Sequence, residues 1–293
     1  MSALNPSMVL LERLEKRAKQ RGRAHRRHAT LIAGVAILGF VIVVTLAAPL
    51  LTSYNPDSID PLSPLVPPFS PGHLLGTDQF GRDVLTRILY GGRIDLLIAF
   101  GATGVTLVAG TAIGLVSGYW GGWVDSVIMR IVDLFFAFPF LVLVIAIVAM
   151  LGPSVFNMFV AIWITSWITY ARITRGHSLG LRRREYVLAA KALGYRHRRV
   201  MLRHILPNVV SAVIIFSMVD AIGNIILASA LGFLGLGAQP PSPEWGTMIA
   251  DGQNYILSSW WLATIPGLAV VFVGVAFSLI GDGLADILRP GDQ

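Results

Sequence analysis

The stretch Leu31–Leu51, LIAGVAILGFVIVVTLAAPLL, decides the class of fold because it contains no charged residue. As a helix rising about 1.5 Å per residue it would extend about 31 Å, which is enough to cross the hydrocarbon core of a bilayer. A secretory signal peptide also follows a basic stretch with an apolar one. This apolar run is too long for a signal peptide, and the tail before it is too long and too charged. We therefore predict an uncleaved first transmembrane helix.

The composition of the whole chain agrees with a membrane protein. Of its 293 residues, 55% are hydrophobic and only 13% are charged, and the mean hydropathy is +0.70. A soluble domain has about 25% charged residues, so this surface is expected to face lipid. The sequence has no cysteine, which excludes disulfides, thiolate catalysis and iron–sulfur clusters. Its six histidines show no metal-ligand spacing, so we expect no metal site.

Five further apolar blocks follow the first span, and together they predict an all-α integral membrane protein of about six transmembrane helices in one bundle. The blocks cover residues 94–117, 127–151, 155–170, 209–236 and 262–280. Outside the first span (31–51), we divide the chain into a basic tail (1–30), a connection (52–93), a core domain (94–288) and a C-terminal tail (289–293). The connection is first proline-rich and then, from Thr77 to Arg93, has the apolar spacing of an amphipathic helix.

Charge predicts the orientation of the bundle. Of the 23 Lys and Arg residues, about eighteen lie in the N-terminal tail or between Arg172 and Arg203. Cytoplasmic segments retain such residues, so both termini and the 172–203 segment of this multi-pass chain are expected in the cytoplasm. This distribution also explains the pI of about 10.1 without nucleic-acid binding. Trp260 and Trp261 fit an aromatic belt at the outer interface.

The most informative loop covers residues 172–208. It contains RRREYVLAAKALGY (182–195) and HILPN (204–208). Its apolar residues have helical spacing, and Gly194 is a plausible helix C-cap. Small side chains at Ala189, Ala190 and Gly194 would leave a smooth face for another protein, and Pro207 suits the first turn of the next span.

This loop resembles the signature of permease subunits of ABC importers, in which Ala-Ala-x3-Gly is followed by Leu-Pro. Its amino-acid sequence is closest to the dipeptide/oligopeptide branch, which includes nickel and glutathione importers. Within that branch it resembles the C-type permease. Three other stretches resemble that branch: LGTDQFGRDVLTR (75–87), ALGFLGLG (230–237) with PPSPEWG (240–246), and LADILRP (284–290). The broader family has glutamate where this chain has Leu188 and isoleucine where it has His204, so the salt bridge of that glutamate is not carried over.

The resemblance implies a type I importer permease, in a bacterial plasma membrane, that forms half of a pathway for di- or oligopeptides by alternating access. Import of nickel or glutathione by the same machinery is the alternative. A homologous second permease, two ATPase subunits that bind ATP and Mg, and an external solute-binding protein would complete the assembly. This chain would be non-catalytic and has no P-loop of its own. Its loop would be a coupling helix seated on an ATPase subunit. The residues assigned to coupling are Glu185, Tyr186, Ala189, Ala190, Lys191, Leu193, Gly194, Leu206 and Pro207.

Three other groups of residues are candidates, each with two interpretations. Gly110, Gly114, Gly118 and Gly122 recur every four residues, which predicts a close helix contact either within the chain or with the partner permease. Asp220 with Asn224 would either line the pathway or form a structural hydrogen-bonded group. Asp78, Arg82 and Asp83 would stand on the external amphipathic helix and either contact the binding protein or pair with one another.

Two other classes of function make different predictions. A stand-alone secondary transporter or channel would show internal repeats, broken helices or a polar relay across several spans. An intramembrane enzyme would need paired catalytic groups at membrane depth, for which Asp133 with Asp220 is the available pair. The chain shows no clear repeat, and its motifs favour the permease.

Overall fold

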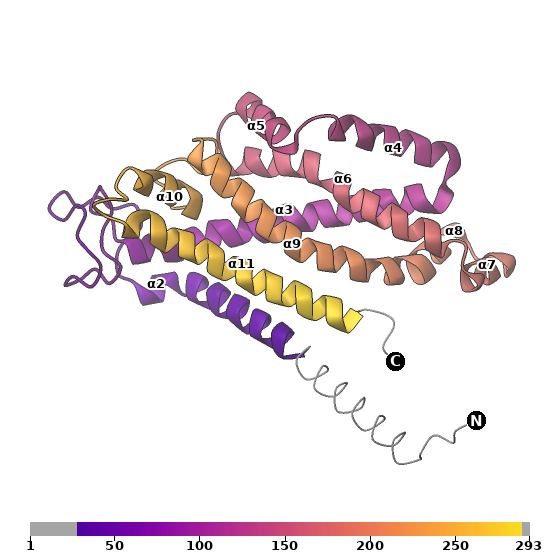
Figure 1. The fold of residues 1–293 in the computed structure, drawn as a ribbon, viewed down its shortest axis with the longest axis horizontal. Helices are drawn as coiled ribbons and strands as arrows, with labels where there is room; N and C mark the ends of the chain where they lie inside the picture. The colour runs from indigo at the N-terminus through magenta and orange to yellow at the C-terminus, as the bar shows by residue number, and fades with distance from the viewer. Residues whose placement is uncertain (1–27, 289–293) are drawn as a thin grey trace, which may run out of the picture.

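The computed structural model describes residues 28–288 as a bundle of long helices (Figure 1). The N-terminal tail up to residue 27 and the C-terminal tail 289–293 lie outside the described residues. The helices are His28–Leu46, α2 (Ala48–Leu51), α3 (Val84–Trp120), α4 (Gly122–Phe136), α5 (Phe140–Leu151), α6 (Val155–Leu181), α7 (Glu185–Ala192), α8 (His197–Val200), α9 (Leu206–Phe233), α10 (Trp245–Gln253) and α11 (Trp261–Leu288). Within residues 28–288 no strand forms.

Four helices in the described part of the chain are long and apolar enough to cross a membrane. They are His28–Leu46, Val84–Trp120, the continuous run His197–Phe233 and Trp261–Leu288. The expected single span over 127–151 is instead the pair α4 and α5, which are bent by 85° and count as a fifth span only if taken together. Pro139 is the N-cap of α5. Because proline lacks a backbone N–H, one straight helix cannot continue through this point.

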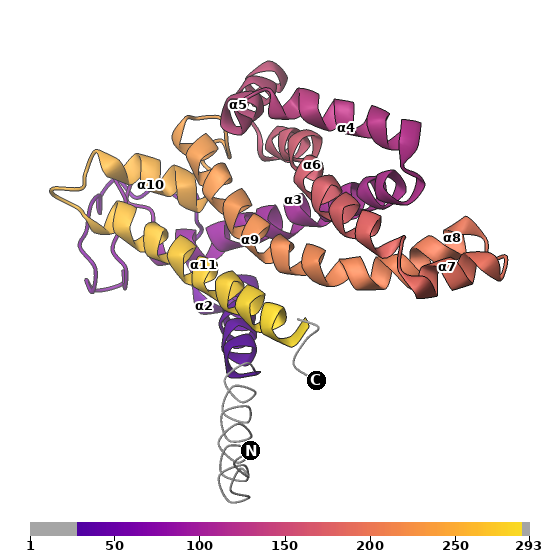
Figure 2. The same cartoon turned by 45° about the vertical axis from the view of Figure 1, so that its right-hand side comes forward.

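Helix α6 is the remaining long helix and corresponds to the predicted span 155–170. It extends to Leu181 instead of ending near Tyr170 as expected. Its composition is more polar than that of the other long helices, and its buried residues include Thr165, Ser166 and Thr174. Such residues are tolerated because this helix packs within the bundle along α3 (Figures 1 and 2).

Three glycines of α3 make that packing possible. A Cβ on Gly110 would clash with the carbonyl oxygen of Trp167, one on Gly114 with that of Ala171, and one on Gly118 would lie 2.6 Å from the Cβ of Ser178. Of the two interpretations, a contact within the chain is therefore present for these three glycines. Gly122 does not share this role, because nothing lies within 4 Å of its Cβ position.

The other long helices meet around a second apolar core. Val41 of the first span, Ile225 of α9, Trp245 of α10 and Phe277 of α11 are all buried in it. Gly34 allows the first span to approach α11, where a Cβ would lie 2.8 Å from the carbonyl oxygen of Ala276. The first span is thus joined to the same bundle as the rest of the chain.

The connection after the first span differs from the expected amphipathic helix over 77–93. The helix begins at Val84, where the Asp83 side chain accepts the backbone N–H of Thr86 at 2.7 Å. Residues 77–83 instead form turns, and Gly81 has a φ of +75° that other residues rarely adopt. Asp78, Arg82 and Asp83 are buried, so they do not stand on an exposed helix face.

Those three residues stabilise the connection itself. The Arg82 Nε donates to Asp78 at 2.6 Å, and the Asp83 carboxylate lies 3.0 Å from His73 Nδ1. Their exposed fractions are 6%, 6% and 5% for Asp78, Arg82 and Asp83. The mutual pairing predicted as one of the two interpretations of the sequence is present for Arg82 and Asp78.

Candidate coupling surface

Helices α7 and α8 lie at one end of the bundle, and the proline-rich connection lies at the other (Figures 1 and 2). Helix α7 follows α6 after a short turn, and α8 continues into α9. The 172–208 segment therefore connects two of the long helices, α6 and α9. Any partner that moves α7 would act on both of them.

One face of α7 is fixed to its own chain. Val187 and Ala190 are 0% and 3% exposed, and they share an apolar cluster with Tyr119 of α3, Tyr170 of α6 and Val209 of α9. We predicted that Ala189, Ala190 and Gly194 would form a smooth outer face, and this prediction is wrong for Ala190. Ala190 lies one helical turn after Val187, so both side chains point to the inner face.

The opposite face of α7 is apolar and uncovered. Tyr186, Leu188 and Leu193 are 44%, 51% and 74% exposed, and Ala189 is also exposed. Lys191 is half-buried, with its ammonium 4.7 Å from the centre of the Tyr119 ring. Exposed apolar side chains gathered on one short helix at the polar end of a bundle are typical of a protein-binding site.

Gly194 ends α7 in the way predicted for a C-cap. Its φ is +77°, the Tyr195 N–H donates to the Ala190 carbonyl at 3.2 Å, and the Gly194 N–H donates to Lys191 at 3.0 Å. These two bonds form a Schellman motif, which needs a left-handed residue at this position. Nothing lies within 4 Å of the Gly194 Cβ position, so the space beside it is open.

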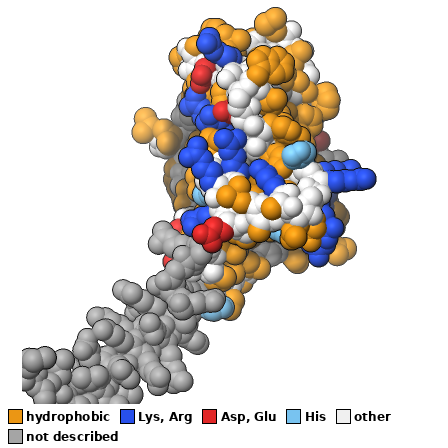
Figure 3. Space-filling view, turned by 90° about the vertical axis from the view of Figure 1, so that its right-hand side faces the viewer, with side chains coloured by type: hydrophobic (Ala, Val, Ile, Leu, Met, Phe, Trp, Pro, Cys, Tyr) orange, Lys and Arg blue, Asp and Glu red, His pale blue; other side chains and the backbone are white. Residues whose placement is uncertain are grey.

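Lys and Arg side chains lie among apolar ones at this end of the molecule (Figure 3). Arg196, Arg199 and Arg203 line a groove of about 450 Å³ with Pro207. Glu185 is exposed and makes no ion pair with another residue of the described range 28–288. Charge at this end of the molecule is therefore predominantly positive, which favours an acidic partner surface.

A π-helical turn joins the loop to α9. Residues Met201–Ile205 form this turn, and the Leu206 N–H donates to the Met201 carbonyl five residues before it. The wider turn accommodates Pro207, which would clash with the carbonyl of an ordinary helical turn. Leu206 is half-buried against the cluster that holds α7, whereas Pro207 is exposed.

Asp220 lies in a polar group between three helices. Its Oδ2 accepts the Tyr170 hydroxyl of α6 at 2.9 Å and the Asn224 amide at 3.1 Å. The same amide donates to Thr103 of α3 at 2.9 Å. Asn224 is 3% exposed, while Asp220 is half-buried. The sequence signal for Asp220 and Asn224 was their depth in a span, but nothing in the sequence pointed to Tyr170 and Thr103 as their partners.

Asp133 and Asp220 do not form a catalytic pair. Asp133 is exposed and accepts from Arg172 at 2.6 Å, whereas Asp220 is engaged with Tyr170. A related ion pair that was not predicted joins Asp125 of α4 to α6, where Arg175 Nη2 donates to the second carboxylate oxygen at 2.6 Å. Over residues 28–288 no group of three or more His, Cys, Asp or Glu side chains is placed to hold a metal ion.

Comparison with known proteins assigns the family. Residues 110–291 match the family described as Binding-protein-dependent transport system inner membrane component. The dipeptide transport system permease protein DppC of Alkalihalophilus pseudofirmus is 43% identical over 265 residues, which cover 90% of this chain and 87% of that protein. The glutathione transport system permease protein GsiD of Pectobacterium atrosepticum is 39% identical and covers 90% of this chain and 88% of that protein.

A solved structure shows the same fold at low sequence identity. An inward-facing conformation of the MetNI methionine ABC transporter has a TM-score of 0.57 and 15% identity, and the match covers 70% of this chain and 98% of that chain. The family match, the curated relatives and the helical architecture therefore agree, and the chain belongs to the family of binding-protein-dependent transport system inner membrane components, the permease subunits of ABC importers.

Proposed function

We propose that this permease forms half of the translocation pathway of an importer for di- or oligopeptides. Support comes from relatives named for such substrates: the dipeptide permease DppC of Alkalihalophilus pseudofirmus at 43% identity and the D,D-dipeptide permease DdpC of Escherichia coli at 39%. Import of nickel or glutathione is the alternative, and the relative GsiD, a glutathione permease that is also 39% identical, supports glutathione. Uptake of labelled dipeptide, labelled glutathione and labelled nickel by cells that carry the complete transporter distinguishes them.

The assembly would contain a second homologous permease, two ATPase subunits and an external solute-binding protein. ATP and Mg would be bound by the ATPase subunits, because this chain contains no Gly-x4-Gly-Lys-Ser/Thr sequence. The chain would supply the membrane pathway and the contact that transmits the ATPase cycle. Its own helices would alternate between states open to one side of the membrane and to the other.

The observation that carries this proposal is the exposed apolar face of α7 at the arginine-rich end of the bundle. Tyr186, Ala189 and Leu193 present it, while Val187 and Ala190 hold the helix to the bundle from behind. An ATPase cleft that bound this face would contact α7, which is itself packed against α3, α6 and α9. Movement of the ATPase would then be passed to the pathway instead of being absorbed by a loose loop.

The continuous helical run from His197 to Phe233 would serve as the lever. Asp220 lies on it, 23 residues from His197, which corresponds to about 35 Å at 1.5 Å per residue. We place Asp220 at the pathway, where its anionic carboxylate would attract the amino terminus of a peptide. Tyr170 and Asn224 would fix its orientation through the hydrogen bonds to Oδ2.

The coupling end would face the cytoplasm, with both termini on that side. Ten Lys and Arg residues between Arg172 and Arg203 support this orientation. The opposite end, with the proline-rich connection, would face the binding protein. Because Asp78, Arg82 and Asp83 are buried, any contribution that they make to that contact would come from shaping the connection.

A charge introduced on the apolar face of α7 tests the coupling contact. Leu193→Arg places a cation on the apolar face, and we expect it to detach the ATPase subunits or abolish peptide-stimulated ATP hydrolysis. Leu62→Arg is the matched control, since Leu62 is 94% exposed at the opposite end of the molecule. Ala190→Arg is unsuitable because that residue is buried within the chain. Normal ATPase attachment and uptake in Leu193→Arg would refute the assignment of α7.

A further inference from the structure

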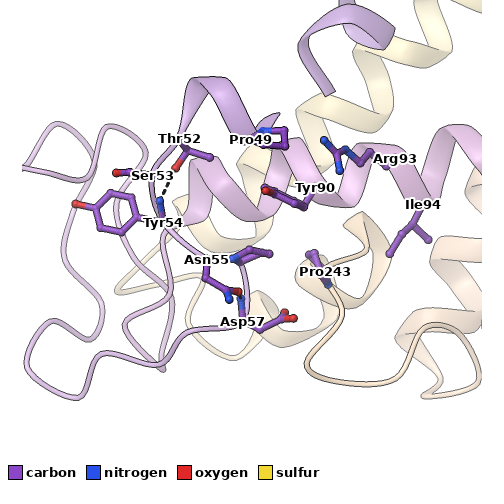
Figure 4. A pocket seen from close by; sticks show the side chains of 11 residues that line it. Pro49, Thr52, Ser53, Tyr54, Asn55, Asp57, Tyr90, Arg93, Ile94 and Pro243 are labelled. Carbon is purple, nitrogen blue, oxygen red and sulfur yellow. Dashed lines mark hydrogen bonds between the residues drawn. The ribbon is translucent and has the colours of Figure 1, made fainter. Parts of the chain in front are cut away.

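A second surface, at the proline-rich end, has the chemistry of a phospholipid site. Two hollows meet there on either side of Arg93. One, of about 680 Å³ and called here the polar hollow, has a mixed lining whose polar side chains include Tyr54, Asn55, Asp57 and Tyr90 (Figure 4). The other, of about 590 Å³, is apolar and is lined by Ile42, Leu46, Leu97 and Phe100. Arg93 lines both hollows.

Arg93 lies at the boundary of the apolar span. Its Nε donates to the Thr45 carbonyl at 2.8 Å and its Nη2 donates to the Leu46 carbonyl at 2.9 Å, and these are the last residues of the helix His28–Leu46. Because a charged guanidinium is costly in hydrocarbon, we infer that this level is where hydrocarbon gives way to headgroups. With two of its five N–H groups used, its other three have no acceptor among residues 28–288.

The polar hollow carries one charge of each sign. In Figure 4, Arg93 and Asp57 lie toward different ends of it, with the Tyr90 side chain between them in this view. Arg93 is held over the Tyr90 ring at 4.7 Å. Asp57 is exposed and forms no ion pair with any residue in the described range 28–288. A ligand group with a phosphate and an ammonium ion would complement both charges.

The apolar hollow continues from Arg93 between the first span and α3. It reaches Gly101, eight residues further along α3 or about 12 Å. Leu46, Leu97 and Phe100 are 65%, 58% and 48% exposed. An uncovered groove of this kind beside a guanidinium suits an acyl chain.

We propose that this composite site binds a zwitterionic aminophospholipid, phosphatidylethanolamine, with its phosphate on Arg93, its ammonium toward Asp57 and one acyl chain in the groove between the first span and α3. The lipid would belong to the leaflet on the side of the proline-rich connection. It would join the first span, α2 and α3 at the membrane surface, apart from the coupling end.

Lipid binding to the assembled transporter tests this site. The purified transporter would be stripped of lipid in detergent and offered vesicles of phosphatidylethanolamine, phosphatidylcholine or phosphatidylglycerol with the same acyl chains. Native mass spectrometry would then count the lipid retained. We expect phosphatidylethanolamine to be retained at least fivefold more than phosphatidylcholine, whose methylated ammonium cannot donate hydrogen bonds to Asp57 or Asn55. Equal retention of the two lipids would overturn the proposal.

Two variants separate the headgroup from the acyl chain. Asp57→Asn should remove the preference for phosphatidylethanolamine while lipid is still bound through Arg93. Leu97→Trp should fill the groove and reduce retention of all three lipids at least fivefold. Val43→Trp is the matched control, because Val43 is 64% exposed on the first span and lines neither hollow. Unchanged retention in Leu97→Trp, with the unfolding temperature of the wild type, would contradict the proposed acyl-chain groove.

Competition between a soluble peptide and the bound lipid is the last test of this site. A dipeptide at millimolar concentration should leave the bound phosphatidylethanolamine in place. Displacement of the lipid by the peptide would assign the polar hollow to a soluble solute and overturn the lipid proposal. None of these results depends on whether α7 couples to an ATPase, so this site and the proposed transport function are tested separately.

Discussion

Gly114 of α3 lies so close to the carbonyl oxygen of Ala171 on α6 that no side chain fits between them. The same contact repeats one turn earlier at Gly110 and one turn later at Gly118. Close backbone approach of this kind is how small residues hold membrane helices together, since lipid tails offer no hydrophobic drive for helix association. The α3–α6 pair is therefore closely packed, and the proposed coupling helix α7 packs against both of its helices.

Replacing Gly114 by leucine should destabilise the bundle. The added side chain must displace α6, and overpacking of this kind typically costs about 1–3 kcal/mol. Gly104→Leu is the matched control, because it lies on the same helix with nothing within 4 Å of its Cβ position. Thermal unfolding in detergent, followed by tryptophan fluorescence, should show a lower midpoint for Gly114→Leu alone. Equal midpoints in the two variants would mean that the contact is not tight.

Much of this architecture follows from the sequence, and the exceptions have physical causes. Apolar runs such as Leu31–Leu51 predicted helices because a bilayer permits few other structures. The break at Pro139 was missed because the run around it is uniformly apolar, so hydropathy gives no signal there. The helix start at Val84 was missed because Asp83 and Gly81 act through local turn geometry.

The candidate site was predicted in part. The loop signature located α7, and Gly194 was correctly predicted as its C-cap. Ala190 was misplaced because the sequence shows that two neighbouring alanines are small, but not which of them faces the bundle. The partners of Asp220, Tyr170 and Thr103, lie on other helices, and contacts between distant segments leave no local pattern in one sequence.

The C-cap of α7 should tolerate asparagine better than valine. Gly194 has a φ of +77°, and a left-handed conformation costs a residue with a Cβ about 1–2 kcal/mol. Asparagine adopts this conformation more readily than β-branched residues do. We expect Gly194→Val to speed hydrogen exchange in 185–195 and weaken coupling, while Gly194→Asn retains most of both. Identical exchange in the two variants would contradict the role of the cap.

Asp220 should affect peptide binding more than stability. Asp220→Asn removes the anion from the proposed pathway, so the half-saturation concentration for uptake should rise several-fold for peptides with a free amino terminus. N-acetylated peptides should be unaffected. Tyr170→Phe removes the hydrogen bond to Asp220 but keeps the anion, so it should raise this concentration less than Asp220→Asn does and should cost about 0.6 kcal/mol of stability. An equal change for both kinds of peptide would restrict Asp220 to a structural role.

Glu244 should make stability depend on pH. Its side chain accepts the backbone N–H groups of Gly246 and Thr247 at 2.7 and 2.8 Å, yet burial holds the pKa of Glu244 above its ordinary value of 4.5. The unfolded chain therefore releases this proton at lower pH than the folded protein, and the stability falls as pH rises from 4.5 through the raised pKa. Glu244→Gln keeps an acceptor but cannot titrate.

The unfolding midpoint in detergent checks this between pH 4 and 7. As the pH rises, the unfolding midpoint of the wild type should fall relative to the midpoint of Glu244→Gln. A constant difference across this range would show that burial does not perturb Glu244.

Cross-linking from the outer face of α7 tests the central claim most directly. The chain has no cysteine, so Leu193→Cys and Leu62→Cys each introduce a single thiol to which a photoactivatable cross-linker can be attached in the assembled transporter. We predict that the cross-linker at position 193 captures an ATPase subunit, identified by mass spectrometry, and that the one at position 62 does not. If the cross-linker at position 193 captures only lipid, or if a membrane-impermeant thiol reagent reaches that position from outside intact cells, then α7 is not the coupling helix.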